Sequence, residues 1–364
     1  MILIVNLNLA VDHIVEVGEL RAGEVQRSRG ARSAAGGKGV NVARVLKTLG
    51  EPSLLLGFCG GRAGDLIESG LRAENIASRC TRVADESRTC LIINDHARRA
   101  QTVINAPGAA VAAAEWRDFE ATYARELPRA QSVVITGSLP PHLPAGTYAR
   151  LTAAARDAGR PVLLDCAGAP LRHALAARPF LVKINAAEAA EFEAAELEAA
   201  ELEAAELEGA ALEAAKLEGA EFEGTQFAAT GLSDAPSADF PVADFSGAHF
   251  PIADFPGAAR AARRLREAGA EHAMITLGGR GALLDFAGVR YKFAAPRVRA
   301  VNSVGSGDAA LAGLAAALRR GLTPEAAGAL AVAAGAANSL HGAGGCSAEE
   351  IAELRPRVGC EVER

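Results

Sequence analysis

Short apolar runs alternate with longer, Ala-rich amphipathic segments along most of the chain. Each run has about the length of a strand, and the segments between runs carry apolar residues at helical spacing. This alternation is typical of βαβ units and predicts an α/β fold built on a largely parallel sheet. The predicted strands are residues 2–6, 53–58, 132–136, 161–165, 180–184, 272–276 and 282–286.

Several of these runs end in Gly, Asp or Asn, as Asn6 and Asp165 do. In an open parallel sheet the ligand crevice lies outside the carboxyl ends of the strands. The sequence therefore predicts a site at that edge of the sheet.

A second pattern, with a period of five, begins at Phe192. On a helix each repeat would advance about 140°, and on a strand successive repeats would alternate faces, so neither element gathers the large residues on one side. A small residue stands two positions before each large one. The pattern resembles the pentapeptide-repeat family and predicts a right-handed quadrilateral β-solenoid inserted at 188–257; a low-complexity Ala/Glu/Leu helix is the alternative. The large residues are Phe192, Leu197, Leu202, Leu207, Leu212, Leu217, Phe222, Phe227, Leu232, Phe240, Phe245, Phe250 and Phe255.

Composition separates this insert from the remainder of the chain. The 364 residues are 50% hydrophobic and 23% charged, with a net charge of −6, which excludes wholesale disorder and gives no bulk reason to expect nucleic-acid binding. Residues 186–258 hold 17 acidic residues and one Lys, a net charge of −16, so the other residues carry +10. An excess of positive charge suits anionic substrates.

The sequence indicates a cytoplasmic protein without a membrane partner. No window contains 18 consecutive apolar residues, and the start has no basic region of the kind that precedes a signal sequence. The six cysteines show neither a CxxC pair nor a nearby His at metal-ligand spacing, so we expect reduced, structural thiols.

Two glycine clusters each run into a predicted helix. VGSGDAALAG contains Gly305, Ser306 and Gly307, whose N–H groups would face an anion at a helix start, with Asp308 in the first turn. AAGGKGVNVARVL, from residue 34 to residue 46, is the other cluster and the first along the chain. The chain lacks GxxxxGK[ST] and a Rossmann fingerprint, so it is neither a P-loop NTPase nor a dinucleotide-binding protein of that type.

The two clusters, in this order, resemble those of the ribokinase-like PfkB carbohydrate kinases. NLNLAVD, TGSLPP, DCAG, VKINAAE and TLGGRGA match further along the chain. The extended GGKGVN and GSLPP most resemble the hexose-phosphate branch, which comprises 1-phosphofructokinase and tagatose-6-phosphate kinase. Three residues depart from the usual pattern of the family: Leu9, Ile184 and Ser306, the serine of GSGD. None of these departures removes a reacting group.

The resemblance implies a three-layer α/β/α kinase domain with a small β-lid at about 8–33 and 88–104. The kinase would occupy 1–187 and 258–364, with the insert at 188–257 between them. Lids of this kind often pair two subunits, so the resemblance implies a homodimer. The acidic insert would either bind a protein partner or be a tolerated expansion.

The implied reaction is ATP-dependent phosphorylation of a hexose phosphate, with fructose 1-phosphate giving fructose 1,6-bisphosphate. Tagatose 6-phosphate or fructose 6-phosphate as the acceptor, or an inactive kinase scaffold that presents the acidic solenoid, are the alternatives. Asp308 would be the base, and Gly305, Ser306 and Gly307 the anion hole.

The resemblance also assigns the substrate contacts. For the sugar and its phosphate it implies Asp12, Arg27, Gly36, Gly37, Lys38, Asn41, Arg88 and Ser138. For ATP it implies Lys183, Asn185, Glu188, Thr276, Gly278, Gly281 and Asn338, with Asn338 near the adenine. Glu188 would hold Mg²⁺ through water.

Overall fold

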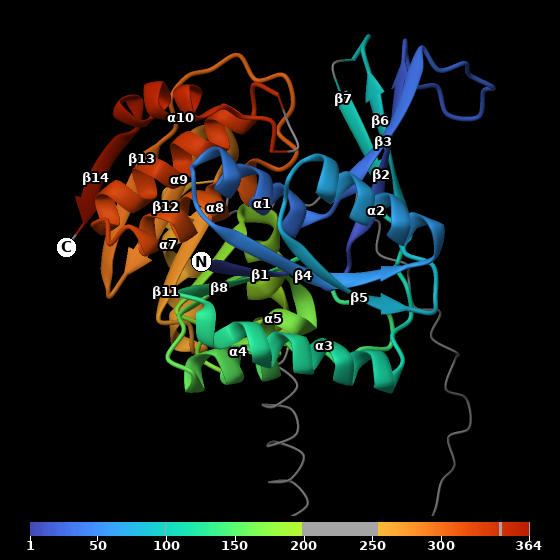
Figure 1. The fold of residues 1–364 in the computed structure, drawn as a ribbon. Coiled ribbons are helices and arrows are strands. Elements are labelled where there is room, and N and C mark those ends of the chain that lie inside the picture. The colour runs from blue at the N-terminus through green and yellow to red at the C-terminus, as the bar shows by residue number, and fades with distance from the viewer. Residues whose placement is uncertain (99, 199–253, 342–343, 364) are drawn as a thin grey trace, which may run out of the picture.

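A computed structural model describes residues 1–98, 100–198, 254–341 and 344–363 (Figure 1). Its main sheet has ten strands in the order β14-β13-β12-β11-β10-β9-β8-β1-β4-β5. The strands from β11 to β5 in this order run parallel, and β12, β13 and β14 extend the sheet as antiparallel neighbours. Their bounds are β14 Gly359–Glu363, β13 Val289–Ala294, β12 Gly281–Phe286, β11 His272–Thr276, β10 Leu181–Asn185, β9 Val162–Asp165, β8 Ser132–Thr136, β1 Ile2–Val5, β4 Ser53–Gly60 and β5 Ser78–Val83.

Every run predicted as a strand is a strand of this sheet, which confirms the largely parallel α/β fold. Residues of β1 alternate between the two apolar cores: Ile2 and Ile4 face one, and Leu3 and Val5 face the other. A strand with both faces covered needs apolar residues at every position, which explains the continuous runs in the sequence.

Helices cover both faces of the sheet. One core contains residues of α1 (Lys38–Thr48), α2 (Gly61–Ala73), α8 (Ser306–Arg319), α9 (Pro324–Asn338) and α10 (Ala348–Leu354). The other contains residues of α3 (Ala113–Glu126), α4 (Thr147–Asp157), α5 (Gly168–Leu175) and α7 (Phe255–Glu267). No helix in these described ranges has the length and apolar character needed to cross a bilayer.

A second sheet stands away from the main one as the predicted lid (Figure 1). Its strand order is β3-β2-β6-β7, with bounds β3 Gly30–Gly36, β2 Ala10–Val17, β6 Arg88–Asp95 and β7 Ala100–Ile104. Residues 18–29, within the first range expected for the lid, form the loop between β2 and β3.

The insert differs from expectation wherever the structure describes it. Residues 186–198 form a helix, and Phe255 begins α7, so these parts of the repeat are not solenoid coils. Phe192 packs in the core of the kinase domain, whereas Leu197 is 51% exposed. The helix-forming Ala and Glu residues explain this outcome. The repeat units from Leu202 to Phe250 lie outside the described residues.

Candidate active site

The second glycine cluster turns the chain into α8 at the carboxyl edge of the sheet. Gly305 caps the helix with φ 81°, in the left-handed region that glycine adopts readily. Ser306 N donates to the Ser303 carbonyl at 3.1 Å, so this N–H, predicted to line an anion hole, is engaged in the turn. Gly307 lies in the first helical turn, where N–H groups lack intrahelical partners. Gly307 is thus the better placed of the two to donate to an anion.

Asp308 follows in the same turn and is buried. Burial raises the pKa of its carboxyl to about 6, and the nearby negative charge of Asp165 acts in the same direction. Lys38, Lys183 and a hydrogen bond from Asn41 partly offset this shift. A carboxylate with a pKa near neutrality is suited to accept a proton from a hydroxyl.

Asp165 ends β9, is fully buried and is bonded to two lysines. Its Oδ2 accepts from Lys183 Nζ at 2.7 Å, and its Oδ1 accepts from Lys38 Nζ at 3.1 Å. Although burial opposes ionisation, the two ammonium groups lower the pKa of Asp165 to about 2. A Cβ placed on Gly307 would stand only 3.0 Å from Lys183 Nζ, so the lysine lies directly against the glycine turn. Two cations and a helix N-terminus therefore converge beside Asp308.

Asn41 joins the first glycine cluster to Asp308. Its Nδ2 donates to Asp308 Oδ2 at 2.9 Å, across 267 positions of sequence. Its Oδ1 accepts from Arg44 Nη1 at 3.2 Å, which requires the amide to turn its NH₂ group toward Asp308. Glu74 accepts two bonds from the same guanidinium, each at 2.7 Å. Arg44 and Glu74 thus fix the orientation of the amide.

On the sugar side, Asp12 of β2 faces Gly36 of β3. A Cβ on Gly36 would overlap the Asp12 carboxylate, so only glycine leaves room for it. Burial raises the pKa of Asp12, while Arg44 and Arg88 lower it. Arg88 is half-buried and donates to the carbonyls of Ala106 and Asn8. The lid strands therefore bring Asp12, Gly36 and Arg88 close to one another.

The remaining sugar-side predictions fall at the junction of lid and core. Gly37 has φ 111° and caps α1, and Gly39 N donates to the buried Asn6 Oδ1 at 2.9 Å. Ser138 is exposed, and its hydroxyl accepts from Asn8 Nδ2 at 3.0 Å. Asn6, one of the polar strand ends expected at this edge, and Asn8, which no pattern singled out, therefore hold this junction.

Arg27 does not join these residues. It is exposed in the loop that connects the outer ends of β2 and β3. Glu16 pairs with the first residue of β3 and is four positions from Asp12 along β2, a distance of about 13 Å. Arg27 thus lies apart from Asp12, Gly36 and Arg88 of its own chain, and its contact with the sugar phosphate stays a prediction.

The nucleotide-side residues lie at the ends of β10 and β11. Asn185 Oδ1 accepts from the N–H groups of Ala187 and Glu188, each at 2.9 Å, and begins the helix of residues 186–198. Glu188 Oε1 accepts from Lys38 Nζ at 3.1 Å, and its Oε2 accepts from Asn185 N at 2.9 Å. Glu188 therefore belongs to the lysine cluster that holds Asp165, and not to a solenoid face.

Thr276, Gly278 and Gly281 lie in and beside the turn between β11 and β12. Gly278 is exposed with φ 59°, and no atom would meet a Cβ there. A Cβ on Gly281 would overlap the Phe293 carbonyl, so this glycine is required by packing.

Asn338, predicted to lie near the adenine, is placed against the glycine turn. It is fully buried, and its Nδ2 donates to the Val304 carbonyl at 2.9 Å and to Ser306 Oγ at 3.1 Å. Its Oδ1 accepts from Gly344 N. An enclosed amide with both ends engaged has no group to offer a base, so Asn338 supports the glycine turn from behind.

The family of the chain follows from comparison with known proteins. The model of the pfkB family carbohydrate kinases matches residues 2–217 and 244–350. The chain belongs to the pfkB family of carbohydrate kinases. Its resemblance to this family, and the ATP-dependent sugar kinase activity that the resemblance implied, are thereby confirmed.

Curated relatives in the pfkB family cover this chain to different extents. The 1-phosphofructokinase of Bacillus subtilis is 29% identical over 359 residues, covering 98% of both chains. That of Xanthomonas campestris is 40% identical over 189 residues, covering 50% of this chain and 59% of its own.

Solved pfkB-type structures share the fold. Phosphofructokinase-2 from Escherichia coli has a TM-score of 0.75 at 23% identity, covering 98% of both chains. Ribokinase from Arabidopsis thaliana has a TM-score of 0.66 at 17% identity, covering 97% of this chain and 98% of its own. These matches confirm the ribokinase-like fold.

Proposed function

We propose that this kinase transfers the γ-phosphoryl group of ATP to a hydroxyl of fructose 1-phosphate, giving fructose 1,6-bisphosphate and ADP. The observation that carries the proposal is the meeting of the two glycine motifs, in which Asn41 donates to the buried Asp308 at 2.9 Å. The choice of acceptor is supported by two curated relatives that are named 1-phosphofructokinase.

Asp308 would act as the general base. It would take the proton from the attacking hydroxyl as the new oxygen–phosphorus bond forms and the bond to the ADP oxygen breaks, with the electron pair leaving on ADP. A positioned base contributes about 10²- to 10⁴-fold. Lys183 and the first-turn N–H groups of α8 would stabilise the charge on the transferring group.

The lysine cluster would bind the anionic ends of both substrates. Lys38 is half-buried and reaches both Asp165 and Glu188, so it stands between the sugar side and the nucleotide side. Asp12 would accept from sugar hydroxyls, and Arg88 would contact the sugar phosphate with the N–H groups that its two carbonyl bonds leave over.

Magnesium fits the nucleotide side. Each Glu188 oxygen accepts one hydrogen bond, which leaves lone pairs for a metal-bound water, and magnesium is commonly held by few carboxylates together with phosphate oxygens. When bound, the ion would neutralise charge on the ATP phosphates.

The test is a panel of acceptors. ADP release would be measured with fructose 1-phosphate, fructose 6-phosphate, tagatose 6-phosphate and fructose, and we expect the highest kcat/KM for fructose 1-phosphate. Asp308→Asn should fold and lose at least about 10²-fold in kcat, while Asp157→Asn, at an exposed position, should match the wild type. A higher kcat/KM for another sugar would make that sugar the acceptor in place of fructose 1-phosphate. No turnover on any sugar would favour the inactive scaffold, and near-normal turnover by Asp308→Asn would remove the base assignment.

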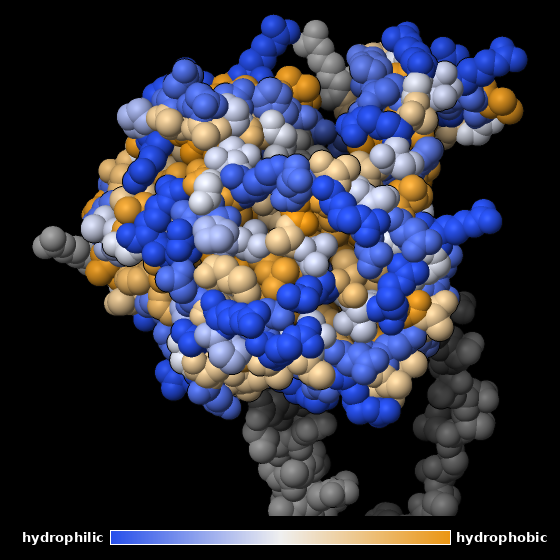
Figure 2. Space-filling model, in the orientation of Figure 1, coloured by the Kyte–Doolittle hydropathy of each residue, from blue (hydrophilic) through white to orange (hydrophobic). Residues whose placement is uncertain are grey.

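We also propose that two copies pair through the lid. The lid and its loop expose the apolar residues Val25, Val103 and Ile104. Figure 2 shows small hydrophobic patches among the mostly hydrophilic surface of this projection. The related phosphofructokinase-2 of Escherichia coli has a tetrameric inhibited form. Light scattering should give twice the chain mass for the wild type and a lower mass for Ile104→Ser; a monomeric wild type would overturn the pairing.

A further inference from the structure

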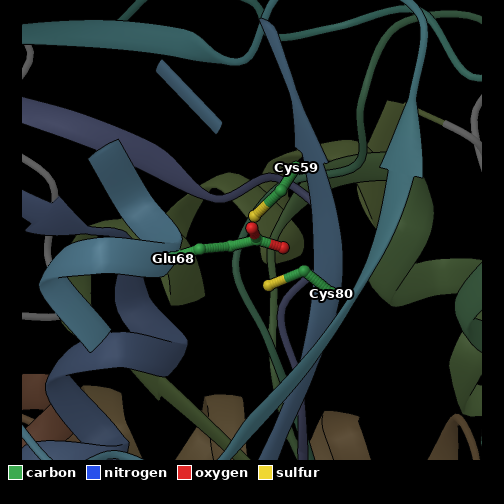
Figure 3. A group of neighbouring side chains, drawn as sticks. All are labelled: Cys59, Glu68 and Cys80. Carbon is green, nitrogen blue, oxygen red and sulfur yellow. The ribbon is translucent and has the colours of Figure 1, made fainter. Parts of the chain in front are cut away.

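Two thiols and a carboxylate, none of them assigned to the kinase site, meet at the edge of the main sheet. Cys59 lies on β4, Cys80 on β5 and Glu68 on α2. One ligand atom from each residue lies within 4.8 Å of the other two. Figure 3 shows the Glu68 carboxylate reaching from the helix toward the two sulfur atoms. Among the described residues this is the one such group of metal-ligating side chains.

The local fold brings these residues together. β4 and β5 are parallel neighbours with Gly57 opposite Cys80, so Cys59, two residues beyond Gly57, points to the same face of the sheet. α2 covers that face closely, because a Cβ on Gly64 would stand 2.8 Å from the Cys59 carbonyl carbon. Glu68 lies one helical turn after Gly64 and therefore on the same side of α2.

The donor set is of the kind that zinc prefers. Zinc is bound by thiolates, imidazoles and carboxylates in tetrahedral sites, at about 2.3 Å from sulfur. In such a site two sulfur atoms are about 3.8 Å apart and sulfur and oxygen about 3.5 Å apart, so donors within 4.8 Å of one another need to approach by at most about 1.3 Å. Magnesium and calcium prefer oxygen ligands, so a site with two sulfur atoms disfavours them.

The surroundings suit the resulting charge and leave a place for water. A divalent ion with two thiolates and one carboxylate carries a net charge of −1. Arg82 Nη1 lies 3.5 Å from Glu68 Oε2 and 3.0 Å from Asp65 Oδ1, so a cation shared with Asp65 stands beside this charge. Cys59 is fully buried, whereas Cys80 and Glu68 are half-buried, so a fourth ligand position has access to solvent.

We propose that Cys59, Cys80 and Glu68 bind a thiolate-preferring divalent metal ion of the zinc class. Binding forms two metal–sulfur bonds and one metal–oxygen bond, and releases the two thiol protons to water. The ion would tie α2 to the β4–β5 edge. Because Gly70 of α2 lies against Ala35 of the lid strand β3, the ion would also stabilise the base of the lid.

The test uses the full-length, reduced, metal-free protein with Co²⁺ as a spectroscopic probe. We expect one equivalent to give a near-ultraviolet thiolate-to-cobalt band with tetrahedral visible bands, and Zn²⁺ to displace it. Zn²⁺ should also raise Tm by several degrees. Cys80→Ser, at a half-buried position, should abolish the band, and Glu68→Gln should weaken Zn²⁺ binding at least tenfold.

Cys360→Ser serves as the matched control, because Cys360 is exposed on β14 and should leave the cobalt spectrum unchanged. Cys59→Ser alters a fully buried residue, so the conclusion depends on Cys80→Ser and Glu68→Gln, each checked for folding by circular dichroism. Absence of the cobalt band in the wild type, or its persistence in Cys80→Ser, would overturn the proposal. The proposal would also be overturned if Cys59 and Cys80 formed a disulfide and the protein bound no Zn²⁺ after that disulfide was reduced.

Discussion

Two buried carboxylates, Asp165 and Asp308, lie near the same lysines, but their pKa values are shifted in opposite directions. Asp165 accepts directly from both ammonium groups, and its pKa falls to about 2. Asp308 interacts with the same lysines without a direct bond, and burial with the charge of Asp165 raises its pKa to about 6. Environments that separate the pKa values of two like groups commonly mark an acid–base assignment. Asp165 thus pairs with the ammonium groups of Lys38 and Lys183, and its own negative charge helps to raise the pKa of Asp308.

This difference predicts the pH dependence of activity. The active form of Asp308 is the carboxylate, so log kcat/KM should rise with pH up to about 6 and level off above it. Asp165→Asn removes a negative charge and frees both lysines to act on Asp308, so the acidic limb should move to lower pH. The measurement is kcat/KM from pH 4.5 to 8.5 for both proteins. If Asp165→Asn folds and the acidic limb of its kcat/KM profile does not move, Asp165 does not affect the pKa of Asp308.

Arg44 is predicted to position Asn41. Arg44→Met removes the donor to Asn41 Oδ1, so the amide is free to turn and its bond to the Asp308 carboxylate weakens. We expect kcat to fall at least about tenfold, because one charge-assisted hydrogen bond contributes about 1.5–3 kcal/mol. Losing a bond to the charged form also raises a carboxyl pKa, so the acidic limb should move to higher pH.

The control for Arg44 is Arg72→Met, which changes an exposed arginine on α2 and should leave kcat and the limb unchanged. If Arg44→Met lowers Tm and moves neither kcat nor the limb, Arg44 has only a structural role.

At this scale the sequence predicted the motif residues and missed their supports. Asp308, Asn41 and Lys183 could be found because each lies in a short recognisable pattern. Glu74 lies 30 positions after Arg44 and carries no local signal, so only the folded chain shows the contact. The exposed position of Arg27 could not be predicted for a related reason, since position along the chain did not show where the lid loop ends.

Among the elements, β3 shows how one glycine serves the site. Gly36→Ala would push a methyl group into the Asp12 carboxylate, so we expect KM for the sugar to rise at least about tenfold. Gly30→Ala changes the other end of the same strand, where no atom would meet the new Cβ within 4 Å, and should leave KM unchanged. Steady-state kinetics of the two variants decide the matter; equal KM values would show that Asp12 does not contact the sugar.

The helix of residues 186–198 explains where the repeat prediction failed. Five residues advance about 140° on a helix, so Phe192 is buried while Leu197, one repeat later, is half exposed. The period was read correctly, but it does not determine the element. Helix propensity and the core contact of Phe192 decided the structure here, and neither follows from periodicity alone.

For the whole molecule, the contacts of Glu188 and Phe192 with the kinase domain limit how much of the insert can be removed. Deleting 218–243, the segment between the two family matches, should keep kcat/KM within about twofold and Tm within a few degrees. Deleting 188–257 removes Glu188 and the buried Phe192, and loss of a core aromatic alone costs about 3–5 kcal/mol. Thermal unfolding and kinetics of both deletions test this. A stable, active protein without 188–257 would restore the wider insert boundary.

The lid strands β2, β3 and β6 join the core at the same level. Ala10 of β2 is in register with both Gly36 of β3 and Arg88 of β6, so their inner ends define a line across the lid. A sheet anchored along a line has one easy motion, a swing about that line. Asp12 is two residues from it, about 7 Å, and Val17 is seven residues away, about 23 Å. Any such swing would sweep the tip of the lid more than three times as far as Asp12, so the entrance would open widely while the proposed sugar contact hardly moves.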